Sequence, residues 1–128
     1  MKYLLDTHLL IWASADDSRL SRRTRQLLED PDNSLIFSAA SIWEISIKTG
    51  LGRPSFRLPA AVFRRGLIEA GYLELDITSA HAVAVGELPA IHSDPFDRML
   101  VAQARTEGYP LLTSDRRVAE YGAPVVLV

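Results

Sequence analysis

Short apolar runs alternate along the chain with longer stretches in which apolar residues recur at helical spacing. Four runs have little or no polar interruption, which is typical of strands buried on both faces of a sheet. These runs are residues 3–5, 35–37, 110–113 and 124–127. A fifth run, residues 72–75, alternates apolar and polar side chains and predicts a more exposed strand.

Cap residues and glycines indicate where the connecting helices begin and end. We expect the first helix to begin at Thr7, its candidate cap, and the second to follow Ser21. Ser38, Thr78 and Asp94 are the candidate caps of later helices. The expected helices are about residues 8–13, 22–28, 39–49, 60–70, 79–85 and 95–107, followed by a short helical turn at 116–117.

This alternation predicts an α/β fold of three layers, α/β/α, with a central and mainly parallel sheet. At 128 residues the chain has the length of one domain with a sizeable hydrophobic core, so we expect residues 1–128 to form a single domain. Cys is absent, and no apolar run approaches the roughly 20 residues of a membrane span. Asp6 and His8 interrupt the apolar amino terminus, so we expect no signal peptide, no membrane association and a cytoplasmic location.

The helix predicted after residue 94 begins with two acids. Asp94 is a good N-cap, Pro95 suits the first helical position, and Asp97 falls in the first turn, where the helix dipole favours a carboxylate. One interpretation is a capping box, in which Asp94 and Asp97 each accept a backbone N–H at the helix start. The other is that Asp97 takes part in chemistry with acids elsewhere in the chain.

Three further acids are predicted to lie near Asp97. Asp6 and Asp115 each follow a buried strand, and ligands of parallel sheets bind beyond the carboxyl ends of the strands. Glu44 lies on a helix that is apolar around most of its circumference, although a surface ion pair with Lys48 also fits its spacing. We expect no Lys within the acidic cluster, so the four carboxylates would repel one another without a bound cation. A divalent ion with oxygen ligands, Mg²⁺ or Mn²⁺, fits this set, and it suits displacement at a phosphodiester.

Other side chains carry weaker signals. The net charge of −2 gives no overall basic footprint for nucleic acid, and the Arg clusters are typical of solvated faces. The three histidines are not spaced as a zinc site, and we expect them in loops or at the surface: His8, His81 and His92. The large aromatic residues are expected to pack in the core or at a dimer interface: Trp12, Phe37, Trp43 and Phe96.

Four segments, LLDT, SAASIWEI, HSDPFDRMLVAQA and LLTSD, together resemble the PIN-domain ribonucleases, and most of all the VapC toxins of bacterial VapBC toxin–antitoxin pairs. The resemblance extends over essentially the whole chain. It implies a PIN-like fold in which four acids bind Mg²⁺ or Mn²⁺, here Asp6, Glu44, Asp97 and Asp115. It also matches Thr7 and Ser114 to hydroxyl positions beside the first and last acids. Asp94 matches a recurring residue, which we interpret first as an N-cap and second as an outer ligand.

The resemblance further implies a Mg²⁺-dependent endoribonuclease that blocks translation, is a homodimer and binds a VapB antitoxin. Asp6 and Asp97 are the expected direct ligands. Arg98, Arg116 and Arg117 either neutralise RNA phosphates or offset the acidic charge, and the sequence favours neither. Two alternatives stay open: a receiver-like signalling domain, although Asp6 stands alone and no Lys occurs late in the chain, and a PIN fold kept only for binding.

Overall fold

The computed structural model describes residues 1–128 and contains one five-stranded sheet, in which every strand pair is parallel and the strand order is β3-β2-β1-β4-β5. The strands are β1 (Lys2–Leu5), β2 (Ser34–Ser38), β3 (Leu73–Leu75), β4 (Leu111–Thr113) and β5 (Val125–Leu127). The helices are α1 (Thr7–Ser14), α2 (Arg22–Glu29), α3 (Ala39–Gly50), α4 (Ala60–Glu69), α5 (Ser79–Gly86), α6 (Pro95–Glu107) and α7 (Arg116–Ala119). None of them is both long and apolar enough to span a lipid bilayer.

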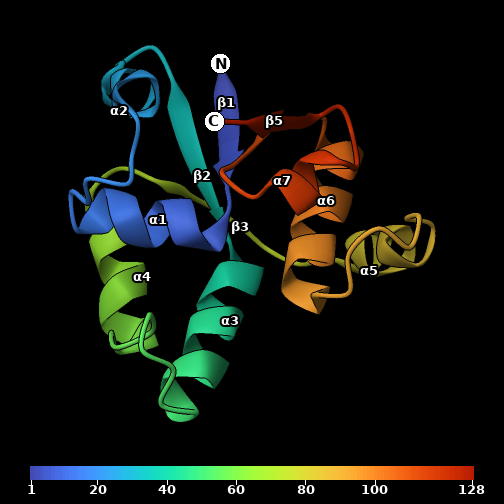
Figure 1. Ribbon diagram of the computed structural model, residues 1–128, viewed down its shortest axis with the longest axis horizontal. Helices are drawn as coiled ribbons and strands as arrows, with labels where there is room; N and C mark the ends of the chain where they lie inside the picture. The colour runs from blue at the N-terminus through green and yellow to red at the C-terminus, as the bar shows by residue number, and fades with distance from the viewer.

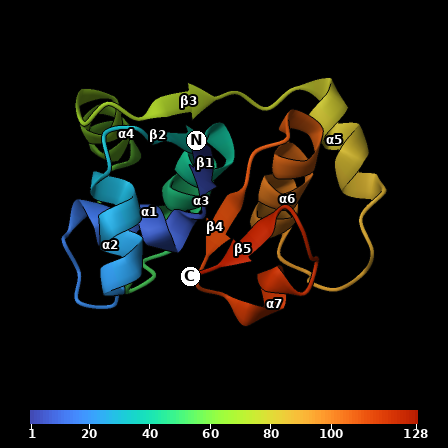
Figure 2. The same cartoon turned by 90° about the horizontal axis from the view of Figure 1, so that it is seen from above.

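Helices cover both faces of the sheet, with α1, α2 and α4 on one side and α5 and α6 on the other (Figures 1 and 2). Neighbouring residues of a strand point to opposite faces, so Leu4 and Leu111 join the core beneath α6 whereas Leu5 and Leu112 join the core beneath α1 and α4. This two-sided burial explains why the strand sequences are continuously apolar. The predicted three-layer α/β/α fold with a parallel sheet is confirmed.

Helix α3 continues beyond the carboxyl end of β2 and packs against both α4 and α6 (Figure 1). Its Ala40 belongs to the core beneath α6, and its Ile45 belongs to the core beneath α4. The helix therefore lies where the two layers meet, at the edge of the sheet to which the strand ends point.

The capping predictions hold for Ser21, Ser38, Thr78 and Asp94, whose side chains all accept backbone N–H groups at helix starts. The predicted cap at Thr7 is wrong, because the first helix is capped by the Asp6 carboxylate, which accepts the Leu9 N–H at 2.9 Å. At the far end of α6, Gly108 adopts a φ of 75°, a left-handed conformation that glycine takes without steric cost.

Candidate metal and catalytic site

The order of the strands reverses at β1, which pairs with β2 on one side and with β4 on the other. Ligand sites of parallel sheets form at this kind of switch point, beyond the carboxyl ends of the strands. Asp6 directly follows β1, and Asp115 lies two residues beyond the end of β4. The two acids expected at strand ends thus lie at the same edge, on the two strands that flank the switch point.

Asp6 is buried, with 5% of its surface exposed, and both of its carboxylate oxygens are held. Oδ1 accepts the Leu9 N–H at 2.9 Å, and Oδ2 accepts the Thr113 hydroxyl at 2.5 Å. Burial raises the pKa of Asp6 to about 6, because the charged form loses its hydration. The two hydrogen bonds oppose that shift, whereas the nearby charges of Glu44 and Asp115 add to it.

Thr113 links the first and last acids, a role that the sequence analysis missed. Its hydroxyl donates to Asp6 and accepts the backbone N–H of Asp115 at 3.0 Å. It is fully buried at the end of β4. The available signal was a lone hydroxyl at the end of an apolar strand, directly before Ser114 and Asp115.

Glu44 projects from α3 and is only 2% exposed. Its Oε2 receives a hydrogen bond from Lys48 at 2.5 Å, while its Oε1 is buried without any hydrogen-bond partner. The predicted pairing of Glu44 with Lys48 is present, but the pair is not on the surface. The expectation that no Lys lies within the acidic cluster is wrong, since Lys48 Nζ also lies 3.9 Å from Asp94 Oδ2.

Asp97 and Asp94 occupy the start of α6 as predicted, but they do not form a reciprocal capping box. Asp94 Oδ1 accepts the N–H groups of Phe96 and Asp97, whereas the Asp97 carboxylate bonds to His92 Nε2 at 2.9 Å. Burial, followed by the charge of Asp94, raises the pKa of Asp97 to about 6. The hydrogen bond from His92 opposes that rise, and the charges of Glu44 and Asp6 contribute further to it.

The four predicted acids therefore lie within electrostatic reach of one another. Ligand atoms of His92, Asp97 and Asp115 lie within 4.8 Å of each other. The charges of Glu44 and Asp115 raise the pKa of Asp6, and the charges of Glu44 and Asp6 raise the pKa of Asp97. Asp115 is the most exposed acid of the four, and its Oδ1 caps α7 through the Arg117 N–H.

His81 is not the loop or surface histidine that we expected, because it lies in α5 and is buried, whereas His92 does lie in a loop, between α5 and α6. His92 is half-buried against Asp97, and His81 is 1% exposed, with its Nε2 3.0 Å from Glu107 Oε2. His8 is exposed, as predicted. The error for His81 has a tertiary cause, since its partner Glu107 comes from the neighbouring helix α6.

The aromatic residues divide between core and surface. Phe37 and Phe96 are buried as predicted, whereas Trp43 is 55% exposed and meets the Phe96 ring edge-on at a centroid distance of 5.0 Å. Trp12 is half-buried. Trp43 thus lies at the surface beside the start of α6, one residue from Glu44.

The remaining predicted site residues differ in how far they are engaged. The Thr7 hydroxyl donates to Ser41 at 2.9 Å and so connects α1 to α3, while Ser114 is half-buried beside Asp115.

Arg98 is engaged within the fold, through hydrogen bonds from Nη1 and Nη2 to backbone carbonyls and to a tyrosine hydroxyl. Of the two roles that the sequence left open for Arg98, binding of RNA phosphates does not fit that position. Arg116 and Arg117 are exposed at the start of α7.

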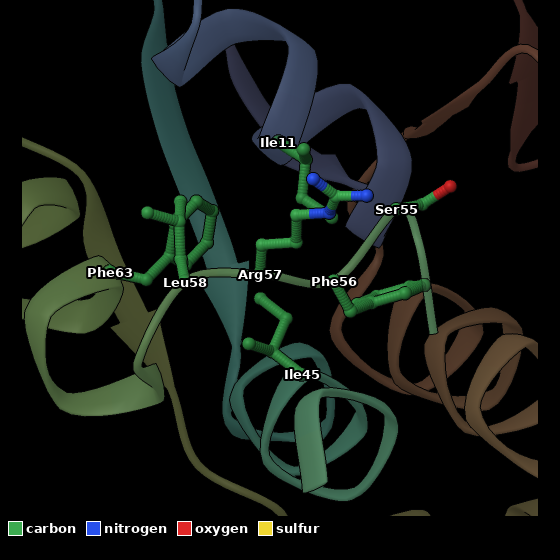
Figure 3. A pocket seen from close by; sticks show the side chains of 7 residues that line it. All are labelled: Ile11, Ile45, Ser55, Phe56, Arg57, Leu58 and Phe63. Carbon is green, nitrogen blue, oxygen red and sulfur yellow. The ribbon is translucent and has the colours of Figure 1, made fainter. Parts of the chain in front are cut away.

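The donors at this site suit a divalent cation. Carboxylate oxygens are the ligands that Mg²⁺ and Mn²⁺ prefer, and four are supplied from both sides of the switch point. The Oε1 atom of Glu44 is buried and has no hydrogen-bond partner. A bound cation, or a water molecule bound to it, would provide the missing interaction. No carboxylate lines the small, mainly apolar pocket between α1, α3 and the loop before α4, whose lining residues include Ile11, Ile45 and Phe63 (Figure 3).

Comparison with known families agrees with this geometry. The family model for the PIN domain matches residues 3–124. This chain belongs to the PIN-domain family. Membership excludes the alternative of a receiver-like signalling domain.

One protein of similar sequence and two structures of similar fold extend the comparison. Ribonuclease VapC22 of Mycobacterium tuberculosis is 31% identical over 121 residues, which are 94% of this chain and 92% of that protein. A chain of the VapBC2 complex of Rickettsia felis, solved with a promoter DNA fragment, superposes with a TM-score of 0.71 at 15% identity, covering 100% of this chain and 98% of that chain. VapC20 of M. tuberculosis, described as a toxin that cleaves the sarcin–ricin loop, superposes with a TM-score of 0.62 at 16% identity, covering 94% and 95%.

Proposed function

We propose that this PIN-domain protein is a metal-dependent endoribonuclease toxin of the VapC type, folded as a single domain over residues 1–128. The observation that carries the proposal is the carboxylate cluster at the switch point, with the buried Glu44 Oε1 left without a hydrogen bond. The similarity to a VapC ribonuclease along 94% of the chain supports the reaction class. An enzyme that cleaves cellular RNA to stop translation acts in the cytoplasm.

Four side chains would hold Mg²⁺ or Mn²⁺. Asp6 and Asp97 would bind the ion directly, because one follows a strand end and the other lies in the first turn of a long helix. Asp115 would bind directly or through water, and Glu44 would bind through water or orient the attacking water as a base. The bound ion would lower the pKa of a water nucleophile and stabilise the charge on the leaving oxygen of the phosphodiester.

Further residues would support these ligands. Asp94 holds the start of α6 in place through two backbone N–H groups, and it would act on the ion only from the outer shell. Thr7 and Ser114 are the hydroxyls nearest in sequence to Asp6 and Asp115, and they would bind waters of the hydrated ion. Lys48 neutralises one oxygen of Glu44, which leaves the other oxygen for water or the ion.

RNA phosphates would be bound by Arg116 and Arg117. Both are exposed and adjoin Asp115, and Arg117 lines an open hollow beside His92. The Arg117 Nε donates to the carbonyl of Ile91 at 3.1 Å, which holds the guanidinium next to the site. We exclude Arg98 from this role because its guanidinium is committed to the protein itself.

We further propose that the protein is a homodimer and binds a VapB-type antitoxin. Structures of similar fold were solved as VapBC complexes, which supports an antitoxin partner. Apolar side chains exposed on α3 and on the segment that follows offer surface for protein contacts. These side chains are Trp43, Ile47, Leu51, Leu58 and Val62.

The test is cleavage of total cellular RNA by the purified, antitoxin-free protein with Mg²⁺, with Mn²⁺ or with EDTA. We expect discrete products that depend on the metal and that sequencing assigns to a target RNA. Asp97→Asn should fold normally and lose activity by at least about 100-fold, because the variant removes a charged ligand. Asp32→Asn, at an exposed aspartate outside the site, is the matched control and should retain activity.

Undiminished cleavage by a folded Asp97→Asn variant would refute the assigned site. A folded wild-type protein that binds Mn²⁺ but cleaves no RNA would favour the remaining alternative, a PIN fold used only for binding. Products that persist in EDTA would contradict metal dependence and point to a contaminating nuclease.

A further inference from the structure

Next to the carboxylate cluster, the loop between α5 and α6 is fastened to the protein at several points around His92. The Tyr121 hydroxyl accepts the backbone N–H of His92 at 3.1 Å, and it also accepts Arg98 Nη1 at 3.1 Å. The same Nη1 donates to the carbonyl of Pro89 at 3.0 Å, and Nη2 donates to the carbonyl of Val85 at 3.0 Å. The loop backbone is thus tied both to α6 and to the segment after α7.

The fastened loop directs one side chain into the site. The His92 ring lies with Nε2 at 2.9 Å from Asp97 Oδ2, and both side chains are about four-fifths buried, at 20% and 21% exposure. A charged carboxylate only accepts hydrogen bonds, so the imidazole donates here. Neither His92 nor Tyr121 belongs to the acid set that the family resemblance implies.

We propose that His92 is a positioning residue for Asp97, and that Arg98 and Tyr121 hold His92 in place for this task. The role rests on the proposed function, since it assumes that Asp97 is a metal ligand. His92 Nε2 is hydrogen-bonded to Oδ2 of the Asp97 carboxylate, and Oδ1 would then be available to hold the ion. Arg98 therefore serves the site by fixing a loop rather than by binding RNA.

Asp97 needs such support for an electrostatic reason. Asp94, Glu44 and Asp6 all act on it with like charge. Without an opposing donor, the carboxylate would gain by rotating away from the cluster or by taking up a proton. The imidazole of His92 supplies a directed hydrogen bond to one oxygen of this carboxylate. Partners of this kind fix the orientation of metal ligands, and their loss costs about 10–100-fold in metal affinity.

The test is Mn²⁺ binding to the full chain by isothermal titration calorimetry, with circular dichroism as the check of folding. We expect His92→Ala to weaken binding by about 10–100-fold. His92→Gln should restore most of the lost affinity, because the glutamine amide places a donor near the position of Nε2. Tyr121→Phe keeps the buried ring but removes the hydroxyl, and we expect it to weaken Mn²⁺ binding by a smaller factor.

Tyr109→Phe is the matched control for Tyr121→Phe, because the Tyr109 ring faces Lys2, away from the site. It should leave Mn²⁺ affinity unchanged. Mn²⁺ electron spin-echo spectra of the wild type should show no strong coupling to a directly bound nitrogen, because the positioning role keeps the imidazole off the ion.

Two results would overturn the role of His92 while leaving the metal site in place. The first is wild-type affinity in a folded His92→Ala variant when Asp97→Asn abolishes binding. The second is a strong nitrogen coupling in the wild-type spectrum, which would make His92 a direct ligand. Mn²⁺ binding that survives Asp97→Asn would instead refute the proposed site itself, and the role of His92 with it.

Discussion

At the scale of single residues, the site holds buried carboxyl groups that are costly to ionise. The ordinary pKa of an aspartate is 3.8, and that of Asp6 rises to about 6 in the folded protein. The folded state therefore binds this proton more tightly than the unfolded chain does. The resulting stabilisation is fully present below about pH 4 and is lost as the pH rises through about 6.

Removing the charge of Asp6 should therefore stabilise the metal-free protein at neutral pH. In EDTA at about pH 7, we expect Asp6→Asn to raise the free energy of unfolding by about 1–3 kcal/mol. The gain should shrink toward about pH 4, where the wild-type carboxyl is itself protonated. Urea denaturation at several pH values measures the difference, with Asp32→Asn as an exposed control that shows little change. A variant less stable than the wild type at pH 7 would contradict the argument.

At the scale of elements, α3 is the carrier of Glu44, and polar contacts near its start fix its position. The Ser38 hydroxyl accepts the Ala40 N–H at 2.9 Å and donates to Gln103 Oε1 of α6 at 2.5 Å. Ser41, one turn from Glu44, accepts the Thr7 hydroxyl. The orientation of the helix thus depends on both neighbouring layers.

Loss of the Ser38 hydroxyl should loosen this arrangement. Ser38→Ala removes the N-cap of α3 and leaves a buried amide oxygen of Gln103 unpaired. We expect the free energy of unfolding to fall by about 1–3 kcal/mol. Ser46→Ala, at an exposed position of the same helix, is the matched control and should be nearly neutral. Equal stability of the two variants in urea would show that the buried hydroxyl contributes nothing.

At the scale of the whole molecule, one sheet separates two cores, and β1, β2, β4 and β5 each contribute residues to both. Leu111 and Leu112 are adjacent and fully buried, yet they belong to different cores. The carboxyl ends of these same strands carry the site, so the sheet sets both the stability of the protein and the position of its acids.

Both neighbouring leucines should therefore be costly to truncate. We expect Leu111→Ala and Leu112→Ala each to lower the free energy of unfolding by about 2–5 kcal/mol, because each leaves a cavity in a packed core. Leu127→Ala, on the edge strand and 44% exposed, should cost less than about 1 kcal/mol. Guanidinium denaturation measures all three. A strong loss in only one of the two buried variants would contradict the two-sided sheet.

The sequence by itself determined the strands, the helices and the edge at which Asp6 and Asp115 lie. Those features follow from local rules: apolar periodicity, cap residues and the direction of parallel strands. The helix start at Asp94 followed from the same rules, as did the positions of Glu44 and Asp97 on their helices.

Only the tertiary structure decided which side chains meet at the site. Asp6 bonds to Thr113 across 107 positions of the chain, and His92 is held by Tyr121 across 29 positions. Lys48 lies within the acidic cluster, and the Arg98 guanidinium is hydrogen-bonded to the loop between α5 and α6. Such contacts depend on side-chain directions and on the spacing between packed elements, and no local pattern in the sequence encodes either of them.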